Sequence, residues 1–149
     1  MIERKYSAKR EEILNLLQSA KIHPGARWIY DQLKLSIPDL SQATVYRNIN
    51  IFCQEKKVLS LGVINGEERF DGISDPHPHL VCSGCGAVLD LPQAKADAMI
   101  QDCKNLSLET SFFIDFRKTI FYGLCKDCHS NPDSLKNNGE GDDGDPDAA

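Results

Sequence analysis

Two Cys-x-x-Cys pairs carry the strongest chemical signal in this sequence. Cys82 and Cys85 form the first pair, and Cys125 and Cys128 form the second. Each pair can grip one metal ion through a tight turn, and four thiolates in a tetrahedral array suit Zn²⁺. Four protein ligands leave no open position on the ion, so we predict a structural zinc site. A redox-active dithiol pair is an alternative, as are chance cysteines in two unrelated turns.

Histidines and carboxylates suggest a second metal site. His77 and His79 alternate along an extended segment, so both imidazoles face the same side. His23 stands before a proline, Asp71 ends a strand-like run, and Asp90 follows the first cysteine pair. Three nitrogens and two carboxylates suit Fe²⁺ or Mn²⁺, and Zn²⁺ could also occupy such a site. Taken singly, His23 is equally explained as a cap or surface residue, and Asp71 as a turn residue.

The first half of the chain has the pattern of a winged helix-turn-helix. Apolar spacing predicts helices over 8–20, 24–36 and 41–56, followed by a hairpin over 58–71 that turns at Asn65-Gly66. In the third helix Val45, Ile49 and Phe52 form an apolar stripe. This helix would read the major groove of DNA with the polar side chains on its other side, namely Gln42, Tyr46, Arg47 and Asn50.

The second half predicts a small α/β unit. Strands are expected over 79–82, 85–91, 111–116 and 118–125, with a helix over 92–106. About 50 residues are marginal for an independent core, so metal binding or dimerisation should support it. The fold class is therefore α+β. We expect a winged-helix domain over 1–72, a ligand-bearing hinge over 73–79, a zinc-stapled dimerisation domain over 80–130 and a disordered acidic tail over 131–149.

Composition and charge narrow the function. The 149 residues contain no apolar run long enough to span a membrane and no apolar leader at the start, so we expect a cytoplasmic protein. Six cysteines in that reducing compartment favour metal or redox chemistry over disulfides. Residues 1–59 hold ten Lys and Arg against six Asp and Glu, whereas 60–129 hold six against ten. A basic front half can approach phosphates although the whole chain has a net charge of −5.

Several motifs together resemble the ferric uptake regulator family. Their order and spacing match from about residue 7 to 129, and the tail lies outside the resemblance. The matching pieces are His23-Pro24, Ala43-Thr44-Val45-Tyr46-Arg47-Asn48, Arg69-Phe70-Asp71, His77-Pro78-His79-Leu80, Cys82-x-x-Cys85-Gly86 and Tyr122-Gly123-Leu124-Cys125-x-x-Cys128.

The resemblance implies a homodimeric, metal-dependent repressor that binds double-stranded operator DNA. It places Cys82, Cys85, Cys125 and Cys128 on the structural zinc. It places His23, Asp71, His77, His79 and Asp90 on the regulatory Fe²⁺ or Mn²⁺ site.

Within the family, the aspartate at Asp90 resembles the branch that senses peroxide stress. The lack of a histidine over 115–118 favours the same branch. In that branch, peroxide reacting at Fe²⁺ oxidises a ligand histidine, which implies His23 and His77 as the oxidation-sensitive residues. A sensor of iron or zinc level within the same family is the alternative.

Three further residues are predicted to contact DNA phosphates, namely Lys9, Arg10 and Lys56. The sequence disfavours two other classes of protein. An enzyme is disfavoured because the sequence has no His-Glu-x-x-His motif, nucleophile triad or glycine-rich phosphate loop. A zinc-stapled protein adaptor without DNA contact is disfavoured by the basic front half and the credible reading helix.

Overall fold

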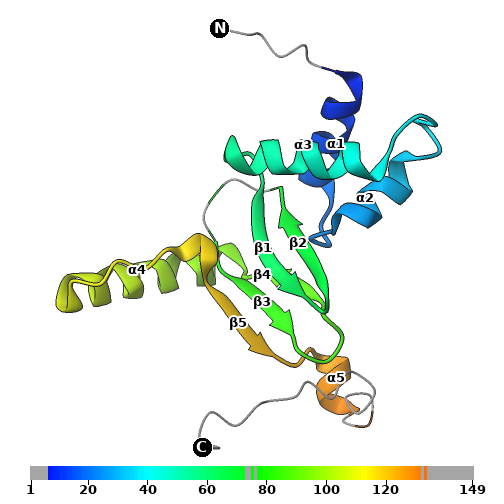
Figure 1. Ribbon diagram of the computed structural model, residues 1–149. Coiled ribbons are helices and arrows are strands. Elements are labelled where there is room, and N and C mark those ends of the chain that lie inside the picture. Colours follow the sequence, from blue (N-terminus) through cyan, green and yellow to red (C-terminus); the bar gives the residue numbers. More distant parts are fainter. Residues whose placement is uncertain (1–6, 73–74, 76, 132, 134–149) are drawn as a thin grey trace, which may run out of the picture.

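The N-terminal half of the computed structural model is a three-helix unit (Figure 1). The structure describes residues 7–72, 75, 77–131 and 133. Helices α1 (Ala8–Ser19), α2 (Ala26–Leu33) and α3 (Gln42–Gln54) confirm the three predicted helices. Ser7 and Ser41 cap α1 and α3 by accepting backbone N–H groups, which fixes where these helices begin. Helix α2 is shorter than predicted and begins after Gly25.

The apolar faces of the three helices share one core. Ile13, Ile29, Val45, Ile49 and Phe52 are all completely buried. The predicted stripe on α3 therefore faces inward, against α1 and α2. Burial of a side chain of this size contributes about 1.5–3 kcal/mol, so this core is the main source of stability for the helical unit.

A two-stranded hairpin follows α3. Strand β1 (Leu59–Ile64) pairs antiparallel with β2 (Glu67–Asp71), and Ile64 faces Glu67 across the turn. Both turn residues, Asn65 and Gly66, have positive φ angles of 51° and 77°. This is the combination that a tight two-residue hairpin needs, and Asn-Gly supplies it at little strain. The predicted wing is confirmed.

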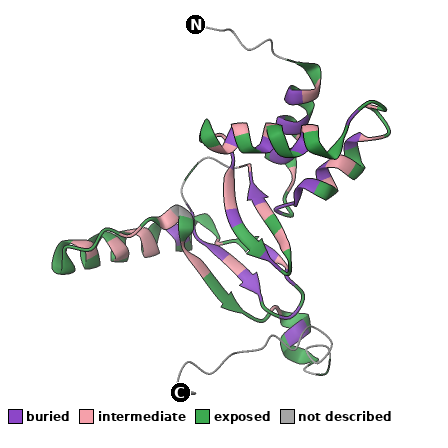
Figure 2. Ribbon diagram, in the orientation of Figure 1, coloured by how far each residue is buried: buried purple, intermediate pink, exposed green. Residues whose placement is uncertain are grey.

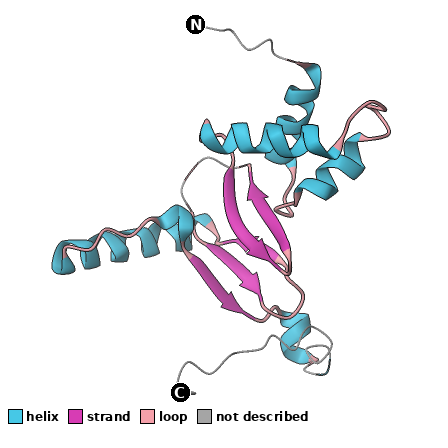
Figure 3. Cartoon of the chain, viewed as in Figure 1, coloured by secondary structure: helices cyan, strands magenta, loops and turns pink. Residues whose placement is uncertain are grey.

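The C-terminal half is built on a three-stranded sheet with the order β4-β3-β5 (Figure 3). Strand β3 (His79–Cys82) pairs antiparallel with β4 (Val88–Asp90) and parallel with β5 (Ile120–Gly123). Helix α4 (Gln93–Thr110) lies between β4 and β5 in the sequence, and the short helix α5 (Lys126–Ser130) follows β5. Helix α4 extends away from the sheet, with the segment that follows it running back alongside, and the helix is mostly exposed (Figure 2).

The strand predicted over 111–116 is wrong. Helix α4 runs to Thr110, four residues beyond its predicted end, and Ser111 closes it in a left-handed conformation. Residues 112–115 are irregular and lead into a 3-10 turn at Phe116–Lys118. Phe112 and Phe113 are 70% and 85% exposed. Aromatic side chains favour strands where neighbouring strands cover them, and the described residues of this chain place no strand beside this segment.

The hairpin also packs on the C-terminal sheet. Leu61 and Ile64 of β1 form a second buried cluster with Val81 of β3 and Val88 of β4. The hairpin therefore belongs to both cores and links the helical unit to the sheet. Parts of the predicted hinge (73, 74 and 76) and nearly all of the acidic tail lie outside the described residues. Among the residues described, no helix combines the length and apolarity that crossing a bilayer requires.

Candidate metal centres

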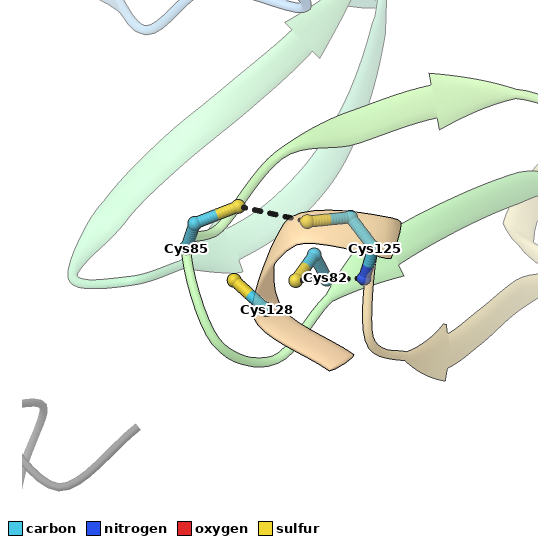
Figure 4. Close-up of side chains that lie close together, drawn as sticks. All are labelled: Cys82, Cys85, Cys125 and Cys128. Atoms are coloured by element: carbon cyan, nitrogen blue, oxygen red, sulfur yellow. Dashed lines mark hydrogen bonds between the residues drawn. The ribbon is translucent and has the colours of Figure 1, made fainter. Parts of the chain in front are cut away.

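The four predicted zinc ligands converge at one end of the sheet (Figure 4). Cys82 ends β3 and Cys85 lies in the following turn, whereas Cys125 and Cys128 come from the start and middle of α5. Their sulfur atoms all lie within 4.8 Å of one another, and the Cys85 and Cys125 sulfurs are 3.9 Å apart. Sulfurs bound at about 2.3 Å to one tetrahedral Zn²⁺ are about 3.8 Å apart, so the cluster has the size of a zinc site.

The electrostatics of the cluster also call for a cation. The Cys125 N–H donates to the Cys82 sulfur at 3.2 Å. This hydrogen bond, with a second from the backbone of Cys85, lowers the pKa of Cys82 to about 6. The neighbouring Cys125 thiol and burial raise the pKa of Cys128 to about 12. A divalent ion bound here would favour the thiolate form of its cysteine ligands.

A second cluster lies between the helical unit and the sheet. His23 comes from the loop before α2, Asp71 from the end of β2, His77 from the segment before β3, His79 from the start of β3, and Asp90 from the end of β4. One nitrogen or oxygen of each lies within 4.8 Å of all the others. Four of the five residues are buried, and Asp90 is the exposed one.

The spacing within this cluster fits a metal coordination shell. Asp90 Oδ1 lies 2.7 Å from His23 Nε2, 2.9 Å from His77 Nε2 and 3.4 Å from His79 Nε2. Asp71 Oδ2 lies 3.0 Å from His77 Nε2 and 2.9 Å from His79 Nε2. Adjacent ligand atoms about 2.1 Å from an ion, with angles near 90° between them, are about 3.0 Å apart.

The tautomer of His77 supports the same interpretation. Its Nδ1 lies 2.7 Å from the Asp75 carbonyl oxygen, which can only accept, so Nδ1 must carry a proton. Its Nε2 then either carries a second proton or presents a lone pair to two carboxylates. Burial lowers the pKa of His77, but the Asp75 carbonyl and the Asp71 and Asp90 carboxylates outweigh burial and raise it. A proton or a metal ion on Nε2 would each balance the two carboxylates that face it.

Most of the residues predicted to contact DNA are accessible. Gln42, Arg47 and Asn50 are exposed on α3, and Tyr46 is 46% exposed. Lys56 is exposed just after the helix.

Two residues of α1 that are predicted to contact DNA phosphates have partners within the protein. Lys9 is half-buried and pairs with Asp39. Arg10 is buried, its guanidinium lies 2.6 Å from Glu55 and 5.2 Å from the Phe52 ring centre, and it therefore serves the packing of α1 on α3. The contact of Arg10 with a DNA phosphate stays a prediction. The sequence alone did not predict the Arg10–Glu55 ion pair, because the two residues lie 45 positions apart in the chain.

A winged-helix unit and a four-cysteine unit joined by a buried five-ligand cluster define a class: a metal-responsive regulator of transcription. The chain belongs to the ferric uptake regulator family, whose profile matches residues 2–112. Members of this family are transcriptional regulators, not enzymes.

The chain is similar to several named members of this family. It is 32% identical to the peroxide-responsive repressor PerR of Staphylococcus saprophyticus over 120 residues. The aligned region covers 80% of this chain and 79% of the relative. It is 31% identical over 120 residues to the peroxide operon regulator of Bacillus subtilis, covering 80% and 81%. The structure resembles the Campylobacter jejuni peroxide stress regulator with a TM-score of 0.68 and 27% identity, covering 80% of this chain and 88% of that one. It shares its fold with the Helicobacter pylori ferric uptake regulator, with a TM-score of 0.70 and 20% identity over 84% and 82% of the two chains.

Proposed function

We propose that this protein is a peroxide-responsive repressor that binds operator DNA as a homodimer when a divalent metal occupies its regulatory site. The observation that carries the proposal is the convergence of His23, from the helical unit, with Asp71, His77, His79 and Asp90. The peroxide-responsive names of the relatives at 31% and 32% identity support the branch. The four-cysteine cluster would hold structural Zn²⁺, and the five-ligand cluster would hold Fe²⁺ or Mn²⁺.

The regulatory site couples the metal to the orientation of the reading helix. His23 precedes α2, whereas His79 and Asp90 belong to the C-terminal sheet. All five ligand atoms can meet only in one arrangement of the helical unit and the sheet. A metal bound by all five therefore favours that arrangement by its higher affinity for it. In a dimer this would set the distance between two α3 helices, which must match successive turns of the major groove.

The structure also offers a route from peroxide to loss of repression. Fe²⁺ held by these residues would activate peroxide for cleavage of its O–O bond, and the two electrons of the net reaction would come from the imidazole that is oxidised. In the net reaction one peroxide oxygen is added to an imidazole carbon and the other leaves as water. His23 and His77 are the proposed targets, and both contact Asp90. An oxidised ring is a poorer ligand, so the arrangement that favours DNA binding would be lost.

Dimerisation is supported by apolar surface that this chain leaves uncovered. Leu108 and Phe113 are 83% and 85% exposed, and Tyr122 is 67% exposed. Strand β5 lies at an edge of its sheet, with its free side open to a further strand. Large exposed apolar side chains gathered on one unit are typical of an interface. A second copy of the chain is the occupant that the family membership favours.

The test is peptide mass spectrometry after stoichiometric peroxide, on protein loaded anaerobically with Fe²⁺ and, in parallel, with Mn²⁺. We expect a gain of one oxygen on the peptide containing His23 or His77, with Fe²⁺ only. His77→Ala should lose the response of DNA binding to peroxide while keeping its zinc. A His77→Ala variant that still bound regulatory metal and responded like the wild type would refute the site assignment.

A sensor of iron or zinc level is the second candidate, because members of the same family serve that function and share this fold. Unmodified histidines in both the Fe²⁺ and the Mn²⁺ samples would favour it. Oxygen found on the cysteines, together with loss of zinc, would instead make the four-cysteine cluster the redox switch.

A further inference from the structure

His23 reaches the five-ligand cluster from a backbone conformation that is unusual for a residue with a side chain. Its φ angle is +52°, in the left-handed region. Such a conformation disfavours a histidine and persists only where its surroundings impose it. The residue is nevertheless only 3% exposed, and its Nε2 lies 2.7 Å from Asp90. Something in the fold must therefore hold this segment in place.

Strand β2 supplies the contacts that hold it. The Arg69 Nε donates to the His23 carbonyl at 2.7 Å, and its Nη2 donates to the Ile22 carbonyl at 3.3 Å. The N–H of Phe70 donates to the Pro24 carbonyl at 3.1 Å. Two adjacent residues of β2 thus bind three successive carbonyls around His23. The planar guanidinium suits this task because its donors are fixed relative to one another.

The same face of β2 also carries a ligand of the cluster. Glu67, Arg69 and Asp71 alternate along the strand and so share one side. Glu67 fills the space beside Gly25, where an added Cβ would lie 1.9 Å from its carboxylate oxygen. Arg69 binds the His23 carbonyl, and Asp71 enters the cluster. One strand therefore determines where the segment before α2 lies relative to Asp71.

We propose that Arg69 is a positioning residue of the regulatory metal centre, holding His23 where its Nε2 can join the other four ligands. Arg69 itself contributes no ligand atom to the cluster. The inference rests on the proposed function, since it requires these five residues to bind a divalent cation. Arg69 would act through the segment that carries His23, because within the described residues its side-chain hydrogen bonds go to the carbonyls of Ile22 and His23.

The direction in which metal affinity changes when Arg69 is replaced distinguishes a positioning role from an effect of its charge. Arg69 is a cation next to a site that binds a dication, so loss of its charge alone should strengthen metal binding. Loss of positioning should weaken it, and partners of metal ligands commonly affect affinity by about 10–100-fold. Arg69→Gln removes both the positive charge and the guanidinium donors that bind the Ile22 and His23 carbonyls. A weakened site would therefore show that geometry outweighs charge.

The experiment is calorimetric titration of Mn²⁺ into the full chain carrying zinc, for the wild type, Arg69→Gln, His23→Ala and the double variant. Arg69→Gln should raise the Kd for Mn²⁺ at least about tenfold, and Arg69→Lys should recover part of that loss. In the His23→Ala background, Arg69→Gln should change the Kd by less than about twofold. Arg27→Gln is the matched control, because Arg27 is exposed and pairs only weakly with Asp31 at 3.9 Å.

The outcomes distinguish this inference from the proposed function. An unchanged Kd in His23→Ala would overturn the metal site itself. A raised Kd in His23→Ala with an unchanged or lowered Kd in Arg69→Gln would overturn only the role of Arg69. Equal effects of Arg69→Gln with and without His23 would also overturn it, because Arg69 would then act on the fold in general. If Arg69→Gln loses its zinc, Arg69→Lys enters the same cycle and the same comparison decides.

Discussion

The side chain of Asn65, at the tip of the β1–β2 hairpin, occupies the space in front of Gly86, next to the turn that carries Cys85. A Cβ atom added to Gly86 would lie 2.3 Å from Asn65 Nδ2, closer than any real contact. Gly86 also has a φ angle of +74°. The tip of the wing is thus seated against the turn that carries Cys82 and Cys85. The hairpin is thereby held to the C-terminal sheet at its tip as well as through Leu61 and Ile64.

Replacing Gly86 should expose the strength of this contact. Gly86→Ala introduces both the strain of a positive φ and a clash with Asn65, whereas Gly66→Ala introduces only the strain, because the space around Gly66 is open. We expect Gly66→Ala to lower the free energy of unfolding by about 1 kcal/mol and Gly86→Ala by at least about 1 kcal/mol more. Urea unfolding checks this. Adding Asn65→Gly should restore part of the loss in Gly86→Ala, and equal losses in the two single alanine variants would contradict the contact.

Loss of the four-cysteine site should unfold the C-terminal unit and spare the helical one. Cys82→Ser should abolish tight zinc binding, and metal binding of this kind contributes about 10–16 kcal/mol in small zinc domains. The single tryptophan, Trp28, packs against the helical core and reports on it by fluorescence. We expect native Trp28 fluorescence with reduced circular dichroism. Cys103→Ser, outside the cluster, should keep its zinc, and zinc loss there would weaken the assignment.

Two arginines of the helical unit should behave in opposite ways. Arg47 is exposed on α3, so Arg47→Ala should weaken DNA binding and change stability by no more than about 0.5 kcal/mol. Arg10 pairs with Glu55 inside the unit, so Arg10→Ala should cost about 2 kcal/mol of stability and leave the affinity of folded protein for DNA unchanged. The DNA is a fragment selected from random sequence by the wild type with Mn²⁺. Reduced affinity of folded Arg10→Ala for DNA would instead support the predicted phosphate contact of Arg10.

The apolar surface of the C-terminal unit should control the oligomeric state. Phe113→Asp places a charge on a side chain that is 85% exposed, and we expect a dimer to become a 16.6 kDa monomer. Leu35→Asp makes the same kind of change at a 92% exposed residue after α2 and should leave the dimer intact. Sedimentation velocity measures both. Dissociation by Leu35→Asp, or a dimer that survives Phe113→Asp, would move the interface elsewhere.

The Arg10–Glu55 pair should make stability depend on pH in the acid range. The hydrogen bond from Arg10 holds the pKa of Glu55 below its usual value of 4.5. A lowered pKa in the folded state means that the pair stabilises the protein above that value and ceases to do so as pH falls through the folded pKa. Glu55→Gln should therefore be less stable than the wild type at pH 7, and the two should converge at low pH. Parallel unfolding curves from pH 3 to 7 test this, and a constant difference would refute it.

Local features of this protein follow from the sequence alone. Ser7 and Ser41 begin their helices, and Asn65-Gly66 closes the hairpin, because each acts on backbone groups within three residues. The stripe of Val45, Ile49 and Phe52 is buried because helical periodicity places these residues on one side. The close spacing within each cysteine pair likewise keeps its two sulfurs near one another. The metal-ligand sets came from spacing together with the family resemblance, and each set meets in one place.

The tertiary structure alone decided what depends on distant partners. The aromatic run at 111–116 forms no strand, because none of the strands that the structure describes pairs with it. Arg10 turns inward because Glu55 and Phe52 lie beside it, and a count of basic residues cannot show such neighbours. Arg69 binds the carbonyl of His23 across 46 residues of sequence. Backbone propensity acts over a few residues, so the local sequence predicts it. The surroundings of a side chain are set by segments that only folding brings together.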